Sequence, residues 1–385
     1  MKLIYFYFGE PRIIYGSAGP MALRGHEVYV VEPNHIFKGS SDRSTLEIEV
    51  GIWRNTKRVQ LNILNLNQYN ILDMVEIFSK INPDVLITGH EYWLMAKRIA
   101  KNLKKPLVTW HIGIPTVFNL SPYLRGRMYS QIFKAPIGLV YNILLAYFSD
   151  YVLTTNIKTE QIYNYVGIRK IKTILPSYPK FMRKDEYARF FKGSNFIVAP
   201  TDDLPLQYVL AFATITINEL HYKYQLKRLY FICEIAKKMP DVNFVIIGTS
   251  KSDIGGAFRY EGLNNLFLLG KVFDDSCLAK LYEKAYCVVC PVLDSGFPTH
   301  LFEAFFYGKA IVSPSVATKC YEGLKHGTNI LLCENTTEAV KYIKKIIRED
   351  KIRIMLEENA RKYYIEYFSP EKHAKELEQV LKSII

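Results

Sequence analysis

Short apolar runs alternate with helical patterns along the first 180 residues. The runs KLIYFYF, HEVYVVEP, PDVLITG, PLVTWH and DYVLTTN are typical of buried strands, and a helical pattern separates them. Strands that alternate with helices predict a parallel, doubly wound α/β sheet, in which ligands bind beyond the carboxyl ends of the strands. Functional residues are therefore expected in the loops that follow the strands.

The pattern restarts after residues 174–194, a segment with two prolines and dense mixed charge. The runs NFIVAP, YVLAFATIT, VNFVIIG, NLFLLGKV, CVVCPVL and KAIVSPS then alternate with amphipathic helices. The sequence thus predicts an N-terminal domain over 1–180, a linker over 181–194 and a second α/β domain over 195–362. Two domains suit a chain of 385 residues, because single cores stop growing near roughly 250 residues.

The last segment, residues 363–385, is predicted to be helical and to pack back toward the N-terminal domain. Ser369 suits an N-cap, and Pro370 suits the first helical position after it.

Charge and apolar content limit the classes of partner. The 50 Lys and Arg against 37 Asp and Glu give a net charge of +13, which favours an anionic partner: nucleic acid, anionic lipid or a phosphorylated substrate. No nucleic-acid-binding motif is present, so nucleic acid is not expected as a partner. The most apolar stretch, Ile132 to Phe148, is broken by Lys134, Pro136 and Asn142 and falls short of the ~20 residues of a membrane span.

The N-terminus and the cysteines predict a cytoplasmic protein. The first residues, MKLIYFYFGE, read as a strand rather than a signal peptide. All six cysteines lie in the second half without the spacing of a disulfide framework, which suits a reducing compartment. No metal site is expected.

The most informative stretch is DSGFPTHLFEAFFYGKAIV, residues 294–312. A Gly-containing turn follows the strand CVVCPVL and passes into a helix from about Thr299 to Gly308. Free N–H groups at a helix start hold phosphate, although Pro298 has none to give. The donors would then be Gly296, Phe297, Thr299 and His300.

Glu303 lies in the first turns of that helix. A carboxylate there can accept hydrogen bonds from two vicinal ribose hydroxyls. It can equally be a surface acid that stabilises the helix N-terminus, and spacing alone does not decide between the two.

This stretch resembles the donor-site segment of the GT-B glycosyltransferases, in particular family 4, the large retaining group. That family usually reads Glu-Gly-Phe-Gly-x-Pro-x-x-Glu-Ala, then a short helix and Gly-x-Pro-Val-Val. Further segments match the family in order, namely 22–31, 83–90, 107–111, 149–155, 174–177, 241–248, 268–272 and 322–329. The resemblance spans nearly the whole chain and implies two Rossmann-like, doubly wound domains that face a cleft.

By this resemblance a nucleotide sugar lies against the second domain, with Glu303 on the ribose and the turn from Gly296 to His300 around the sugar and phosphate. Lys227 falls at the lysine that stabilises the departing diphosphate, with Arg228 beside it. The strand-end residues Gly248, Lys271 and Val272 complete the implied donor site.

Two positions depart from the family pattern. The arginine that accompanies the lysine is absent, and Lys223 or His221 would have to replace it. The basic residues of this region can also be solvated charges at a helix start. Ser295 stands where the family has its first glutamate, which contacts the donor sugar, so the sugar stays open; Asp294 is adjacent.

The acceptor is implied on the first domain, where a long stretch has basic residues and no acidic ones. From Glu91 to Asp150 its basic residues are Lys97, Arg98, Lys101, Lys104, Lys105, Arg125, Arg127 and Lys134. Together with interleaved aromatic residues they suit an anionic membrane surface or a lipid-linked acceptor. The other interpretation is a solvated helix face beside a core helix over 137–148.

Candidate acceptor or sugar contacts are Gly16, Gly19, His90 and His111. The two histidines can also be hydrogen-bonded strand-end residues without a ligand.

The predicted activity is metal-independent transfer of a sugar from a nucleotide-sugar co-substrate, with retention and without a further cofactor. A cytoplasmic location, peripheral to the membrane face, goes with it. The alternatives are a non-catalytic nucleotide-sugar-binding protein that assists another transferase and, less favoured, a sugar-nucleotide epimerase.

Overall fold

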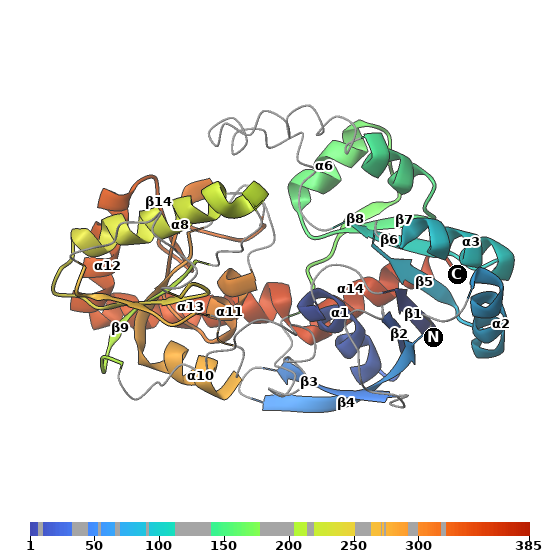
Figure 1. Ribbon diagram of the computed structural model, residues 1–385, viewed down its shortest axis with the longest axis horizontal. Coiled ribbons are helices and arrows are strands. Elements are labelled where there is room, and N and C mark those ends of the chain that lie inside the picture. The colour runs from blue at the N-terminus through green and yellow to red at the C-terminus, as the bar shows by residue number, and fades with distance from the viewer. Residues whose placement is uncertain are drawn as a thin grey trace. The chain divides into compact units, whose positions relative to one another are not determined.

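The computed structural model describes residues 1–6, 11–32, 45–52, 55–65, 70–89, 92–111, 140–177, 204–213, 219–250, 263–270, 272, 275–291, 299–316 and 321–385. The described chain forms two compact units (Figure 1). Unit 1 contains the described residues up to 177 together with 366–385, and unit 2 contains those from 204 to 365. The linker predicted over 181–194 and the run NFIVAP lie outside the described residues.

Unit 1 is an eight-stranded sheet with helices on it. Its strands are β1 (Lys2–Phe6), β2 (Glu27–Glu32), β3 (Thr45–Ile52), β4 (Asn55–Asn65), β5 (Val85–Thr88), β6 (Leu107–His111), β7 (Tyr151–Thr154) and β8 (Ile171–Thr173). Its helices are α1 (Pro11–Leu23), α2 (Ile71–Ile81), α3 (Trp93–Leu103), residues 140–147, α6 (Ile157–Tyr165) and α14 (Pro370–Lys382).

The strand order of unit 1 is β3-β4-β2-β1-β5-β6-β7-β8, and every pair except β3–β4 is parallel. β1 is central, and Leu3 to Phe6 are fully buried because sheet neighbours and covering helices enclose it. The apolar runs that predicted β1, β2, β5, β6 and β7 are confirmed as strands.

The β3–β4 hairpin was not predicted from the apolar runs. Its strands alternate instead: Ile48 and Val50 are buried, whereas Glu47 and Arg58 are exposed and form a 3.5 Å ion pair across the hairpin. Alternation of this kind marks a strand with one face toward the core and one toward water.

Helix α14 belongs to unit 1, where it packs against α1. The predicted cap is confirmed, since the Ser369 side chain accepts a 3.3 Å hydrogen bond from the Lys372 amide and Pro370 occupies the first turn. Arg24, just after α1, forms a 2.6 Å ion pair with Glu378.

Unit 2 is a six-stranded, wholly parallel sheet. Its strands are β9 (Tyr208–Phe212), β10 (Phe244–Ile247), β11 (Leu266–Leu268), β12 (Ala285–Val289), β13 (Ile311–Pro314) and β14 (Leu331–Cys333). Its helices are α8 (Glu219–Lys237), α10 (Asp275–Lys284), α11 (Thr299–Phe306), α12 (Thr336–Arg348) and α13 (Asp350–Phe368), the last of which runs on into unit 1 at residue 366.

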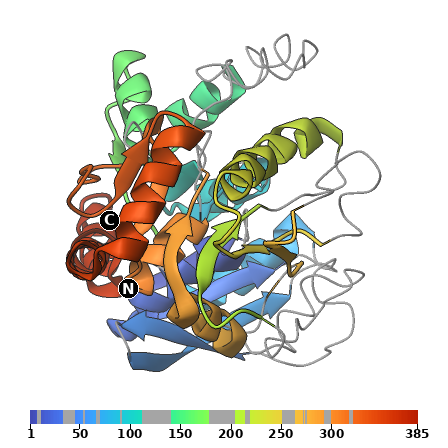
Figure 2. The same cartoon turned by 90° about the vertical axis from the view of Figure 1, so that its left-hand side faces the viewer.

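The order β11-β10-β9-β12-β13-β14 is the 3-2-1-4-5-6 order of a Rossmann sheet when β9 is counted first. The prediction of a Rossmann-like second domain is thereby confirmed. Figure 2 shows the long helix α8 in yellow-green, and it packs beside α12.

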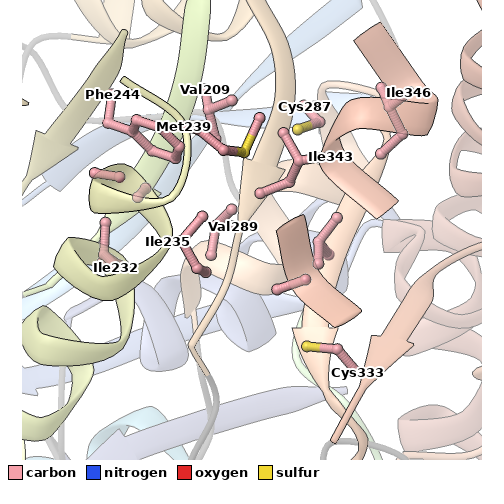
Figure 3. Close-up of a cluster of buried hydrophobic side chains, with 14 of the residues drawn as sticks. Val209, Ile232, Ile235, Met239, Phe244, Cys287, Val289, Cys333, Ile343 and Ile346 are labelled. Atoms are coloured by element: carbon pink, nitrogen blue, oxygen red, sulfur yellow. The ribbon is translucent and has the colours of Figure 1, made fainter. Parts of the chain in front are cut away.

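The core of unit 2 forms where α8 and α12 meet the sheet (Figure 3). Side chains from two helices and the two central strands pack together there. They are Ile232 and Ile235 from α8, Ile343 from α12, Val209 from β9 and Val289 from β12. This packing fixes β9 and β12 beside each other and so determines what lies at their carboxyl ends.

None of the described helices is long and apolar enough to cross a membrane.

Candidate functional site

The sheet of unit 2 changes direction between β9 and β12. The connections from β9 lead to β10 on one side, and those from β12 lead to β13 on the other. In open α/β sheets the ligand binds outside the carboxyl ends of the strands at this switch point. The described residues at this edge include Phe212 at the end of β9 and His300 and Glu303 in the helix that follows β12.

Glu303 is almost completely buried, with 2% of its surface exposed. The hydroxyl of Tyr282 donates a 3.2 Å hydrogen bond to its Oε2. The interpretation of Glu303 as a surface acid is therefore wrong. Burying a carboxylate is costly unless it is hydrogen-bonded, and a buried carboxylate at the ligand-binding edge of a sheet is a candidate functional group.

The ring of Tyr282 belongs to a stack of four aromatic side chains. Tyr282 of α10 stacks on Tyr307, just after α11, at 4.3 Å between centroids, and on Phe212 of β9 at 5.8 Å. Phe212 in turn stacks on His300 of α11 at 5.3 Å and 13°. The stack joins the end of β9 to α10 and to the helix that carries Glu303, so these residues are held as one packed group.

The end of α11 is fixed by a glycine. Gly308 has φ 60°, a conformation that other residues adopt rarely, and its amide donates to the Phe305 carbonyl at 3.0 Å. A Cβ at Gly308 would lie 2.3 Å from Nε of Arg361 in α13. Lys309 then pairs with Glu357 at 3.3 Å, both nearly buried, and ties this end of the helix to α13.

The ends of β10 and β11 converge on the same edge of the sheet. The amide of Gly248, with φ 101°, donates to the carbonyl of Gly270 at 2.7 Å, and Thr249 Oγ1 donates to the carbonyl of Ala213 just after β9. Val272 is buried beyond β11. Gly248 and Val272 therefore lie at the strand ends where the sequence placed them.

The basic residues after β9 lie in a helix and not in a loop. Helix α8 begins at Glu219, so Lys223, Lys227 and Arg228 follow its start within the helix, which corrects the expected loop. Lys, Leu, Gln and Glu are good helix formers, and they continue the helix N-terminally from its amphipathic part. Arg228 is half-buried, and the side chains of Lys223 and Lys227 lie outside the described residues.

Several predicted donor residues cannot be placed. Ser295, Gly296, Phe297, Pro298 and Lys271 lie outside the described residues. Thr299 begins α11 as predicted, but only its backbone is described. Their roles stay predictions.

The candidates on unit 1 are of two kinds. His111 ends β6, is buried, and its Nδ1 lies 2.8 Å from the hydroxyl of Tyr163, as in the alternative interpretation of a hydrogen-bonded strand-end histidine. Gly16 and Gly19 lie within α1, where the Gly16 carbonyl accepts hydrogen bonds from the amide and hydroxyl of Ser177. His90 lies outside the described residues.

Gly19 has a packing role. A Cβ at this position would lie 2.8 Å from atoms of Ile48 and Val50 in β3, so glycine lets α1 approach the hairpin closely.

Known structures with a similar fold include a glycosyltransferase and a protein from Listeria monocytogenes assigned as a UDP-N-acetylglucosamine 2-epimerase. HepE from Anabaena in complex with UDP-glucose is similar over 100% of both chains, with 14% identity and a TM-score of 0.65. The chain has the GT-B fold. Sucrose-phosphate synthase from Thermosynechococcus elongatus shares this fold at 14% identity and a TM-score of 0.63, over 100% of this chain and 98% of that chain. A glycosyltransferase from Rickettsia africae does so at 14% identity and a TM-score of 0.60, over the same shares.

The sequence of unit 2 carries the family signal within this GT-B fold. Residues 207–349 match the model of the family described as Glycosyl transferases group 1. The matched range contains Glu303 and Tyr282. The resemblance to group 1 glycosyltransferases is confirmed in this region, and the narrower assignment to family 4 stays a prediction. No curated protein matches the chain in sequence.

Tyr282 and Phe212 are site residues that the sequence did not indicate. Both appear as ordinary apolar positions, one on the inner face of α10 and the other at the end of β9. Only tertiary packing brings them to Glu303.

Proposed function

We propose that this protein is a glycosyltransferase that moves a sugar from a nucleotide-sugar donor to an acceptor, with retention at the anomeric carbon. The observation that carries the proposal is the buried carboxylate of Glu303 at the switch point of a Rossmann sheet. The group 1 family match over 207–349 and the GT-B fold support it. HepE, which shares the fold, is seen with UDP-glucose.

In this proposal Glu303 accepts hydrogen bonds from the two vicinal hydroxyls of the donor ribose. Ionised carboxylate oxygens are acceptors only, which suits a pair of hydroxyl donors. Backbone N–H groups at the start of α11 and the turn before it face the sugar and phosphates. The segment before the helix is Ser295, Gly296, Phe297 and Pro298, and Thr299 and His300 begin the helix.

Lys227 stabilises the diphosphate as it departs, with Lys223 and Arg228 as neighbouring positive charges. The leaving phosphate helps to take the acceptor proton, so the reaction requires neither a separate protein base nor a metal ion. Gly248, Lys271 and Val272 line the base end of the donor through their backbone.

The acceptor is proposed to be lipid-linked or a growing glycan presented at an anionic membrane surface. The helix over residues 140–147 and the residue after it turn large apolar side chains outward. They are Val140, Tyr141, Leu144, Tyr147 and Phe148, spaced as one face of a helix, whereas Leu145 and Ala146 on its other side are buried in the core.

A helix with basic residues packs against the buried side of this helix. Trp93 of α3 donates a 3.0 Å hydrogen bond to Ser149, so α3 with its lysines and arginine packs beside the helix. Among the described residues from 92 to 177 the acids are Asp150 and Glu160, and both accept backbone N–H bonds, at 2.8 and 2.6 Å. An apolar helix face with neighbouring cations suits peripheral binding to anionic headgroups.

Thermal-shift measurements test the donor site. UDP, GDP, ADP and their common sugar derivatives are compared on the wild type, on Glu303→Ala and on Glu283→Ala, an exposed carboxylate of α10 that serves as the control. A ligand that binds only the folded state adds about 2.7 kcal/mol at 100 times its Kd.

One nucleotide family should raise the melting temperature of the wild type and of Glu283→Ala but not of Glu303→Ala. No shift with any nucleotide would overturn the proposal. Binding without hydrolysis or transfer of the sugar would instead favour the alternative, a non-catalytic nucleotide-sugar-binding protein that assists another transferase.

A further inference from the structure

Glu303 holds its carboxylate in a site where that group has little water around it, which makes its orientation depend on the protein. A glutamate carboxylate, carried on three rotatable bonds, reaches both hydroxyls of a ribose only in a narrow range of rotations. Something in the packed group must therefore fix that rotation before the ligand arrives.

We propose that Tyr282 is a positioning residue that orients the Glu303 carboxylate toward the ribose of the donor. The inference rests on the proposed function. Its observation is the 3.2 Å hydrogen bond from the Tyr282 hydroxyl to Oε2 of Glu303, between two side chains that are each at most 2% exposed.

The ring of Tyr282 has little freedom to move. Tyr307 stacks on it at 4.3 Å and 18°, and Phe212 stacks on it at 5.8 Å and 27°. Tyr307 follows Glu303 by one helical turn, and its amide donates to the Glu303 carbonyl at 2.9 Å. The same turn of α11 therefore carries the carboxylate and one of the rings that hold its partner.

The hydroxyl of Tyr282 is a permanent donor. Burial raises the pKa of Tyr282 well above its usual value, and the nearby Glu303 carboxylate raises it further. The phenol stays protonated across the working range of pH, so the proton lies toward Glu303. A charge-assisted hydrogen bond of this kind is stronger than a neutral one.

The resulting chain of contacts runs from the strand end to the ligand. Phe212 at the end of β9 fixes the Tyr282 ring, the ring aims its hydroxyl, and the hydroxyl sets the plane of the carboxylate. Tyr282 acts through Glu303 and does not itself touch the donor.

The test compares ribonucleotides with their 2′,3′-dideoxy forms. Binding of UDP, GDP and ADP, and of the dideoxy form of each, is measured by calorimetry on the wild type and on Tyr282→Phe, which keeps the stacked ring and removes only the hydroxyl. We expect Tyr282→Phe to lower the affinity for the ribonucleotide about tenfold, the scale of one hydrogen bond to a charged group. The affinity for the dideoxy form should not change.

Tyr208→Phe is the matched control. Tyr208 is also buried in unit 2, and its hydroxyl donates to the carbonyl of Leu281 in α10 at 2.9 Å, so its loss perturbs the same helix without touching Glu303. It should leave the ratio of ribonucleotide to dideoxynucleotide affinity unchanged.

A double variant tests whether Tyr282 acts through Glu303. Because Tyr282 acts through Glu303, the double variant Tyr282→Phe, Glu303→Gln should bind the ribonucleotide no more weakly than Glu303→Gln alone. Equal loss for ribose and dideoxyribose, or additive losses in the double variant, would overturn the positioning role. If the wild type binds none of the nucleotides, the proposed function and this inference fail together. If the wild type binds but Tyr282→Phe has no ribose-specific effect, only the inference is overturned.

Discussion

The Nδ1–H of His373 donates a 2.8 Å hydrogen bond to the carbonyl of Leu175. This bond joins α14 to the segment that follows β8 in unit 1. Nδ1 must be the donor because the carbonyl can only accept. Nε2 is then the acceptor and lies 3.1 Å from the Ser17 hydroxyl in α1. The ring also stacks on Trp110 of β6. His373 is therefore held in one neutral tautomer.

This arrangement predicts a pH dependence of stability. Burial lowers the pKa of His373 to about 4 in the folded chain, against 6.5 for an unperturbed histidine. Between these values the unfolded chain binds a proton that the folded chain does not, so stability falls as the pH drops from 6.5 toward 4, by up to about 3 kcal/mol. Urea unfolding at pH 7 and pH 5 measures this loss.

The His373→Gln variant isolates the contribution of this residue. The difference between pH 7 and pH 5 should shrink in His373→Gln and persist in His326→Gln, because His326 is exposed. An equal pH dependence in wild type and His373→Gln would contradict the prediction.

Gly19→Ala should destabilise unit 1. The added methyl would lie 2.8 Å from Ile48 Cδ1 and Val50 Cγ2, and overpacking of this kind costs about 1 to 3 kcal/mol. Thermal unfolding of Gly19→Ala measures the loss, and the added substitution Ile48→Val, which deletes one of the two contacted atoms, should restore part of it. Full stability in Gly19→Ala would show that α1 can move away from β3 without cost.

Lys227→Ala should lower turnover far more than stability. If its charge stabilises the departing diphosphate, kcat falls by about two orders of magnitude, as for other single electrostatic contacts in the transition state. Steady-state kinetics and melting temperature are measured together. Lys237→Ala, exposed in the last turn of the same helix, is the control and should keep its turnover. Unchanged turnover in Lys227→Ala refutes the role.

The double variant Tyr147→Ser, Phe148→Ser should lose binding to anionic vesicles. These side chains are 73% and 55% exposed, so their removal costs little packing. Flotation with vesicles of phosphatidylglycerol and phosphatidylcholine at low salt should carry the wild type upward and leave the variant behind, and added salt should weaken the wild-type binding. Wild-type protein that ignores the anionic vesicles excludes the membrane interpretation.

Apolar runs predicted both sheets because strands buried on both faces carry continuous apolar sequence. The β3–β4 hairpin escaped this criterion, since Ile48 and Val50 alternate with charged residues. Helix α8 begins at Glu219, ahead of its amphipathic part, because its first turns contain the helix formers Glu, Leu, Lys and Gln. Periodicity therefore revealed elements with a buried face and missed the extensions that propensity alone supports.

The candidate site was predictable to the extent that it is local. The strand, turn and helix around Glu303 are continuous in sequence, and α11 begins at Thr299 as expected. The buried setting of Glu303 was not predictable, because Tyr282 reaches it from α10 and is itself packed on Phe212 of β9. Sequence spacing also could not distinguish a ligand-contacting glycine from Gly19. The close neighbours of Gly19 are Ile48 and Val50 in β3, some 30 residues further along the chain.

The place of α14 in unit 1 affects the order in which the chain can mature during translation. All of unit 2 is synthesised before this helix, yet Leu377 and Leu381 of α14 are fully buried in unit 1. On the ribosome, unit 2 can finish folding before α14 has been made. Until then the side of α1 that binds α14 stays uncovered, although unit 1 was begun first. The first-made half of the protein is therefore the last to be completed, and a ribosome that stops within α13 releases a chain whose unit 1 lacks its closing helix.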